Sequence, residues 1–209
     1  GFYIGFFEEK RNDFTITRPF VDLLKGQKDT LNAKSHPWEG VVDPRLPIYT
    51  TSVDGSYVGM PYGIASNEIM PSMVGAAPDW YSPTSHPVTL NADFPVPLMT
   101  FAELQFIISE YKGFSAAEYK EGIKASLEYW SGINGSPISA SQIDSYIAAV
   151  SENVTPETVA LQKYIDLYMN GTEAWVEYRR TGYPTQIIKP GEISCIVDGE
   201  PLVFDPLSD

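Results

Sequence analysis

The residue types with the clearest chemical potential gather in one stretch of the chain that is rich in proline and aromatic residues. Sugar rings present apolar C–H faces and a belt of hydroxyl groups, so a site that holds them needs aromatic platforms beside carboxylates and amides. This stretch supplies all three residue types, and its Pro78-Asp-Trp-Tyr-Ser-Pro83 turn favours exposure of the indole. The alternative is that the aromatic rings only hold the loop onto the rest of the protein. We interpret as a candidate carbohydrate-binding set the residues Tyr57, Tyr62, Asn67, Asp79, Trp80 and Tyr81.

The sequence patterns that would indicate catalysis are weaker than those that indicate carbohydrate binding. Glycoside hydrolysis needs two carboxylates that flank one bond, but 27 acidic residues supply such a pair by chance. The sequence contains no nucleophile elbow, glycine-rich phosphate loop or zinc-ligand cluster. His36 and His86 lie far apart, each before a proline, and the single Cys195 has no partner for an internal disulfide. We therefore expect a protein that is not an enzyme and uses neither a cofactor nor a metal.

The composition excludes other classes. A net charge of −13 lacks the basic footprint that phosphate backbones require, so we expect no nucleic-acid partner and interpret the acidity as a solubility feature. A hydrophobic fraction of 43% with 13% aromatic residues is typical of a globular chain. No run of eighteen apolar residues occurs, so we expect no membrane-spanning segment.

The elements that must position the candidate set are mostly helical. Thr100-Glu103, Ser115-Glu118 and Ser139-Gln142 each match a capping box, in which the first and fourth residues satisfy each other's backbone N–H groups. Thr155 before Pro156 is a further N-cap. Apolar residues recur at helical spacing after each signal. We predict four helices, the first paired with the second and the third with the fourth, because short connections favour antiparallel neighbours.

The chain after the fourth helix predicts another short helix. Gly171 is expected to end the fourth helix, and the next begins near Thr172 and ends at Gly182. Its Trp175 is interpreted, like Trp38 and Trp130, as a core or loop anchor. One residue of the Arg179-Arg180 pair is expected to bind a helical carboxylate such as Glu103 or Glu173, while the other covers apolar surface.

The remaining chain is expected to be loop-rich. A helix is predicted over 18–25, and ten of the seventeen prolines fall in 37–97, which predicts irregular chain with short strands at most, over 46–51 and 55–58. After Pro184 an alternating pattern around Asp198-Gly199 predicts a two-stranded hairpin. The whole is predicted to be a predominantly all-α single domain over 1–209, with a loop-rich region (1–99), stacked tetratricopeptide-like helical hairpins (100–184) and a tail hairpin (185–209), so β structure is minor.

Several motifs occur in a specific order. They are Asp43-Pro44-Arg45, Gly59-Met-Pro-Tyr-Gly63, Pro97-Leu-Met-Thr-Phe-Ala-Glu-Leu-Gln-Phe106, Gln162-Lys-Tyr164 and Glu173-Ala-Trp-Val-Glu-Tyr-Arg-Arg-Thr-Gly-Tyr-Pro184. Together they resemble the SusD/RagB-like outer-membrane lipoproteins of Bacteroidetes. The resemblance covers about residues 40–184, corresponds to about the later half of a family member, and departs from the family after Pro184.

The resemblance implies both an architecture and a function. The architecture is one of helical hairpins with long intervening loops. The function is that of a non-catalytic, surface-exposed protein that binds oligosaccharide or polysaccharide and passes it to a SusC-like TonB-dependent transporter for import. Attachment to the outer membrane would be through a lipidated N-terminal cysteine after a signal peptide, and because this sequence contains neither, we expect a truncated or split form. The alternatives are a helical-repeat module that binds another protein and, less favoured, a glycoside hydrolase.

Overall fold

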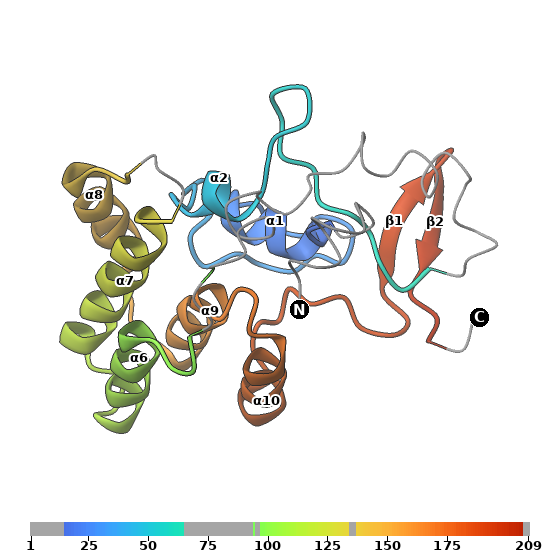
Figure 1. Cartoon of the computed structure of the whole chain (residues 1–209). Helices are drawn as coiled ribbons and strands as arrows, with labels where there is room; N and C mark the ends of the chain where they lie inside the picture. The colour runs from blue at the N-terminus through green and yellow to red at the C-terminus, as the bar shows by residue number, and fades with distance from the viewer. Residues whose placement is uncertain (1–14, 65–93, 95–96, 134–136, 207–209) are drawn as a thin grey trace. The chain divides into compact units, whose positions relative to one another are not determined.

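The computed structural model describes residues 15–64, 94, 97–133 and 137–206 (Figure 1). Helices dominate this part of the chain, and its one sheet has two antiparallel strands, so the prediction of a predominantly helical fold with minor β structure is confirmed. Of the helices in these ranges, none has the length and apolarity needed to cross a bilayer. The chain divides into two compact units. Val41–Ile48 and Asp93–Thr185 form the helical unit, and Gly1–Gly40, Tyr49–Ala92 and Gln186–Asp209 form the mixed unit.

The helical unit confirms each helix predicted from residue 100 onward. Capping explains where they begin. Ser139 and Gln142 form both halves of a capping box, and Thr155 forms one with Thr158. Thr100 caps its helix in one direction only, and Ser115 makes no side-chain cap bond, although Glu118 pairs with Lys112. The helices are α6 (Phe101–Tyr111), α7 (Ala116–Ser131), α8 (Ala140–Val150), α9 (Pro156–Asp166) and α10 (Gly171–Thr181).

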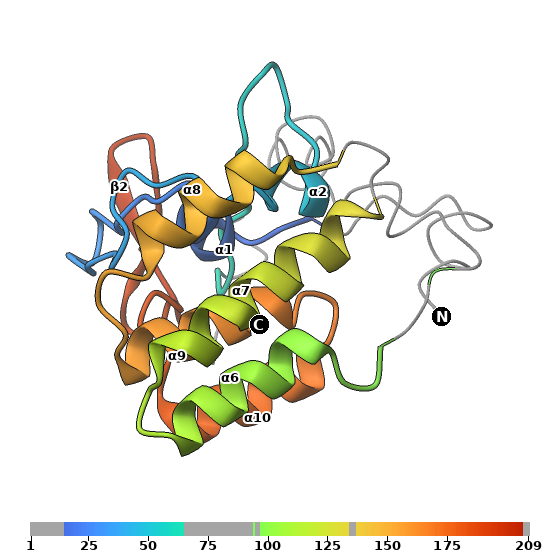
Figure 2. The same ribbon diagram turned by 90° about the vertical axis from the view of Figure 1, so that its left-hand side faces the viewer.

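Packing within the helical unit confirms one predicted pair and corrects the other. The α6 and α7 helices form a hairpin, in which Gly122 permits close contact because a Cβ there would lie 2.7 Å from Cε1 of Phe106. The prediction that α8 pairs with α9 is wrong, since α8 lies against α7 and α9 packs against α6 (Figure 2). Leu161 and Ile165 of α9 are completely buried, and this apolar face determines the neighbour more strongly than the short connection does.

A buried ion pair joins the segment Val41–Ile48 to three of these helices. Arg45 and Asp43 are 0% and 2% exposed, and Nε and Nη2 of Arg45 donate to the two carboxylate oxygens at 2.9 and 2.6 Å. Arg45 also donates to Ser126 of α7 and to Gln162 of α9, each at 2.7 Å. The Tyr146 hydroxyl of α8 donates to Asp43 and accepts from Gln162 at 3.0 Å. Charges removed from water are tolerated only when bonded in this way.

The mixed unit contains α1 (Arg18–Leu24) and a hairpin of β1 (Ile193–Val197) and β2 (Glu200–Val203). The helix predicted over 18–25 is confirmed to within one residue, as is the tail hairpin. Asp198 and Gly199 both have positive φ, 51° and 89°, as the tight turns that match strand twist require.

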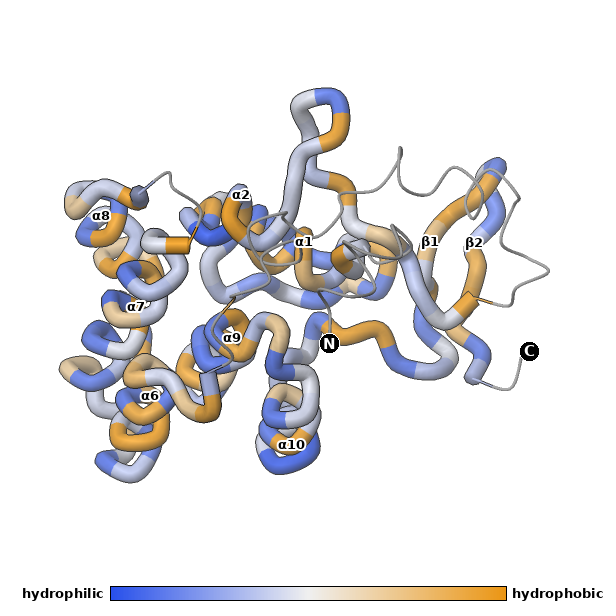
Figure 3. Tube along the Cα trace, in the orientation of Figure 1, coloured by the Kyte–Doolittle hydropathy of each residue, from blue (hydrophilic) through white to orange (hydrophobic). Residues whose placement is uncertain are grey.

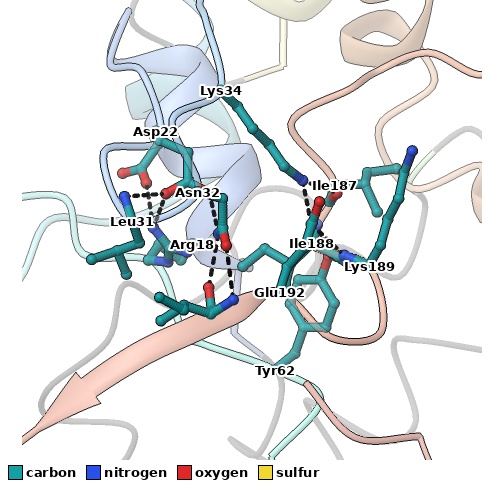
Figure 4. A network of polar contacts seen from close by, with 12 residues as sticks. Arg18, Asp22, Leu31, Asn32, Lys34, Tyr62, Ile187, Ile188, Lys189 and Glu192 are labelled. Atoms are coloured by element: carbon teal, nitrogen blue, oxygen red, sulfur yellow. Dashed lines mark hydrogen bonds and ion pairs between the residues drawn. The ribbon is translucent and has the colours of Figure 1, made fainter. Parts of the chain in front are cut away.

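Polar contacts hold the tail against the chain around α1 (Figure 4). The Asn32 side chain bonds the backbone of Ile193 in both directions, donating to its carbonyl oxygen at 2.9 Å and accepting from its N–H at 2.8 Å. Lys34 donates to the Ile187 carbonyl oxygen at 2.7 Å and pairs with Glu192. The last segment of the chain is therefore an integral part of the mixed unit.

Two short strands predicted in the proline-rich region are wrong. Residues 46–49 form a single helical turn, α2 (Leu46–Tyr49), because Asp43 accepts from the backbone N–H groups of both Arg45 and Leu46 and so starts a helical turn. Residues 55–58 form no strand, since Gly55 lies in a turn that closes only an isolated bridge between Val53 and Ser56.

Replacing Tyr146 tests the buried ion pair. Tyr146→Phe removes one donor to Asp43 and leaves a buried Gln162 N–H without its acceptor, so we expect the free energy of unfolding to fall by about 1–3 kcal/mol. Urea unfolding followed by circular dichroism measures this change. Tyr111→Phe is the matched control, because that ring is 90% exposed, and we expect it to change stability by less than about 0.5 kcal/mol. Equal stability of the two variants would contradict a structural role for the Tyr146 hydroxyl.

Candidate functional site

The predicted carbohydrate-binding set is only partly within the described residues. Asn67, Asp79, Trp80 and Tyr81 lie outside them, so their assignment stays a prediction. Tyr57 and Tyr62 are described, and both are half-buried residues of the mixed unit.

Tyr62 serves the packing of the tail. Its hydroxyl donates to the Ile188 carbonyl oxygen at 3.1 Å and accepts from the Ile188 N–H at 2.8 Å (Figure 4). Its ring meets Phe204 edge-on at 5.9 Å, and its carbonyl oxygen accepts from Ser194 Oγ at 2.6 Å. The hydroxyl is thus engaged by the tail as both donor and acceptor.

Tyr57 is held through its backbone. The Lys25 ammonium donates to the Tyr57 carbonyl oxygen at 3.1 Å, and burial raises the pKa of the Tyr57 phenol above its usual value. The phenol therefore stays protonated at neutral pH and keeps its O–H donor. An aromatic ring with a donor hydroxyl is one component of a sugar-binding surface.

The tryptophan predictions hold in part. Trp38 and Trp130 are 7% and 2% exposed, so their assignment as anchors is confirmed. The same assignment is wrong for Trp175, which is 57% exposed, because α10 buries none of its residues. Tyr178 stacks on the Trp175 ring at 6.0 Å, and the Arg179 guanidinium lies 5.6 Å from the ring centre. The helical spacing predicted an apolar face but could not show that no element among the described residues covers it.

Ion pairs hold α10 in place of apolar burial. Arg180 makes a bidentate pair with Glu110 of α6 at 2.6 and 2.7 Å, and it also binds Glu177 at 2.8 Å. Lys163 of α9 lies 3.2 Å from Glu177 and 3.9 Å from Glu103. One arginine does bind helical carboxylates, as expected, but they are Glu110 and Glu177. The examples named in the prediction, Glu103 and Glu173, are wrong, since Lys163 pairs with Glu103. Gly171 was expected to end α9, but α9 already ends at Asp166. Gly171 is instead the first residue of α10.

These contacts and burial shift the pKa values of two carboxyl groups in opposite directions. Burial raises the pKa of Glu103, and the Lys163 ammonium only partly offsets this. Burial also acts on Glu177, but hydrogen bonds from Arg180 and the charge of Lys163 outweigh it and lower the Glu177 pKa. Glu103 is 3% exposed, so its raised pKa belongs to helix packing and not to an accessible acid.

Two surface features of the helical unit were not predicted. Apolar residues recur along α6 (Figure 3) on the face opposite its buried residues. Together with the two exposed residues before the helix they form a surface that we call the α6 stripe, which consists of Leu98, Met99, Phe101, Leu104, Ile107 and Tyr111. A helix that is apolar on two opposite sides usually packs on both. The other feature is an open hollow of about 560 Å³ beside Asp43-Pro44 and α8, and its lining includes Ser141 and Ser145.

Comparison with known proteins gives a family and a fold. Residues 2–194 match the model of a SusD-like family described as starch-binding and associating with the outer membrane. A solved structure of a chitin-binding protein superposes with a TM-score of 0.61 at 22% identity, over 83% of this chain. This chain spans 39% of the length of that neighbour. No curated protein matches the chain.

The ion pairs of α10 predict a pH-dependent stability. The pKa of Glu177 is lower in the folded state than the ordinary value of 4.5, so its contribution is fully present above 4.5 and is lost as the pH falls through the folded-state pKa. We expect Glu177→Gln to lower the free energy of unfolding by about 1–2 kcal/mol at neutral pH. Denaturant titrations at several pH values should show this difference narrowing in acid. Glu128→Gln, whose 3.8 Å pair with Lys124 is half exposed, should show almost no difference at any pH.

Proposed function

This chain belongs to the SusD-like family of starch-binding proteins that associate with the outer membrane, and we propose that it binds a glycan there without cleaving it. The observation that carries the proposal is the family match over residues 2–194, which includes the signature residues whose contacts the structure describes. Asp43 and Arg45 of one motif meet Gln162 of another in the buried ion-pair network. These motifs therefore support the scaffold, and the ligand contacts are expected elsewhere.

We assign those contacts to the aromatic loop region. Asp79, Trp80 and Tyr81 combine two rings with a carboxylate, and Asn67 adds an amide. Tyr57 contributes a half-buried ring with a protonated hydroxyl, while Tyr62 contributes its ring and positions the tail. Stacking on apolar sugar faces, with hydrogen bonds to the hydroxyl belt, is the recognition chemistry that this composition suits.

The further steps of the function follow from family membership. The bound oligosaccharide would pass to a SusC-like TonB-dependent transporter for import, and the protein would be held on the cell surface by a lipid anchor. Binding without cleavage is likewise what family membership implies. Glu103 and Asp43 are buried and committed to Lys163 and Arg45, so these two carboxylates are not candidates for catalysis. A glycosidase needs two carboxyl groups open to the same bond.

Removal of one indole tests the glycan proposal. We expect Trp80→Ala to weaken binding to the retained polysaccharide by at least about tenfold, the equivalent of about 1.4 kcal/mol. Affinity electrophoresis against a panel of polysaccharides, including starch and chitin derivatives, measures the change. Trp175→Ala is the matched control, because that indole is exposed on α10, and it should leave binding unchanged. Release of reducing sugar ends by the wild-type protein would rule out binding without cleavage.

A second candidate function, docking of another protein, is favoured by the α6 stripe. Leu98 and Tyr111 are 95% and 90% exposed, and Phe101 is 56% exposed. Soluble proteins rarely expose contiguous apolar surface of this kind unless it serves an interaction. The stripe would accept an α-helix on the side of α6 opposite to α7 and α9.

Polar replacement within the stripe separates this candidate from glycan binding. We expect the wild-type chain to bind a hydrophobic fluorescent dye or to self-associate at high concentration, and Phe101→Gln with Leu104→Gln to reduce both without affecting polysaccharide retention. Dye fluorescence and sedimentation equilibrium measure these properties. Ile196→Gln, at a position 53% exposed on β1, controls for the loss of any exposed apolar residue. A monomeric wild-type chain that binds no dye would remove the second candidate.

A further inference from the structure

A small, partly open cavity lies in the mixed unit between residues of α1 and Gln186 of the tail. It offers about 10 Å³ to the centre of a water-sized molecule, which is close to the minimum for one bound water. A cavity of this size admits no organic ligand. It is lined by Arg18, Pro19, Asp22, Gln27, Asp29 and Gln186.

Arg18 lines this cavity and carries donors that are not used. Its Nη1 atom lies 3.3 Å from Asp29 and 3.6 Å from Asp22, whereas Nε and Nη2 are buried and have no hydrogen-bond partner among the described residues (Figure 4). The backbone of Arg18 is fixed, because its N–H donates to Met60 at 2.8 Å and a Cβ at Gly59 would lie 2.4 Å from its Cα. Buried guanidinium donors without an acceptor are costly, and here the backbone cannot move to relieve them.

Gln186 supplies the complementary acceptor. The residue is 4% exposed, and its Nε2 donates to the Ser35 carbonyl oxygen at 2.8 Å, which fixes the orientation of the amide. The other amide atom, Oε1, is buried and has no partner in the part of the chain that the structure describes. Among the lining residues, Arg18 therefore needs an acceptor for its unused N–H groups, and Gln186 needs a donor for its Oε1 atom.

The charges around the cavity select a neutral molecule. The carboxylates of Asp22 and Asp29 and the Oε1 atom of Gln186 repel an anion, and a cation cannot accept hydrogen bonds from the unused Arg18 donors. Water accepts from Arg18 and donates to Gln186, and its second hydrogen is free for a carboxylate of the lining, giving the three bonds typical of a buried water. We propose that one water molecule binds in this cavity and bridges Arg18 of α1 to Gln186 of the tail.

A crystal structure of the whole chain, at a resolution that orders solvent and with bromide in the soak, tests the proposal. We expect one solvent peak within about 3.2 Å of both an unused Arg18 nitrogen and Gln186 Oε1, without anomalous signal. A bromide peak at that place would show an anion site and overturn the proposal. So would a cavity without density, or an Arg18 side chain bonded directly to Gln186.

Two variants extend the test to the acceptor. Gln186→Leu removes the acceptor, so it should lose the peak and lower the melting temperature. Gln27→Leu is the matched control, because Gln27 also lines the cavity but is exposed and has no buried atom without a partner. It should keep both the peak and the melting temperature. A peak that persists unchanged in Gln186→Leu would contradict the bridging role.

Discussion

The helical unit depends on the burial of one charge pair. Arg45 is completely buried, and a guanidinium in that position must have a carboxylate and further acceptors around it. Those partners come from α7 and α9, and Tyr146 of α8 binds the carboxylate of Asp43, so the pair fixes three helices at once. The geometry explains why a proline-rich segment far from the helices in sequence is ordered within their unit. It also explains why Asp43-Pro44-Arg45 and Gln162, which are far apart in sequence, belong to one hydrogen-bond network.

Ionic contacts play a different part at α10. That helix has no buried residue, and its attachment rests on Arg180, Lys163 and the carboxylates they bind. Partly exposed ion pairs contribute little each, so α10 is held less firmly than the helices of the core. Its exposed Trp175 and the α6 stripe leave apolar surface on this unit that no described element covers. The helical unit thus has a well-packed core, and its exposed apolar residues on α6 and α10 are suited to recognition.

The sequence predicted what local chemistry determines. Thr100, Ser139 and Thr155 mark helix starts because a cap acts on the next three residues, and Asp198-Gly199 defines its own turn. The errors concern residues whose state depends on distant partners. Trp175 lies on a helical face of the right pattern, but burial requires a neighbour that spacing alone cannot supply. The Tyr62 hydroxyl is likewise bonded to Ile188 of the tail, 126 residues away, which no local pattern predicts.

The bond between Asn32 and Ile193 has a consequence for biosynthesis. The two residues are 161 positions apart, and at about 5–20 residues per second the ribosome releases the second roughly ten to thirty seconds after the first. Helical hairpins, whose contacts are local, assemble in far less time. The intervening helices can therefore finish folding on the nascent chain, while the segment around α1 waits until Ile193 has been translated.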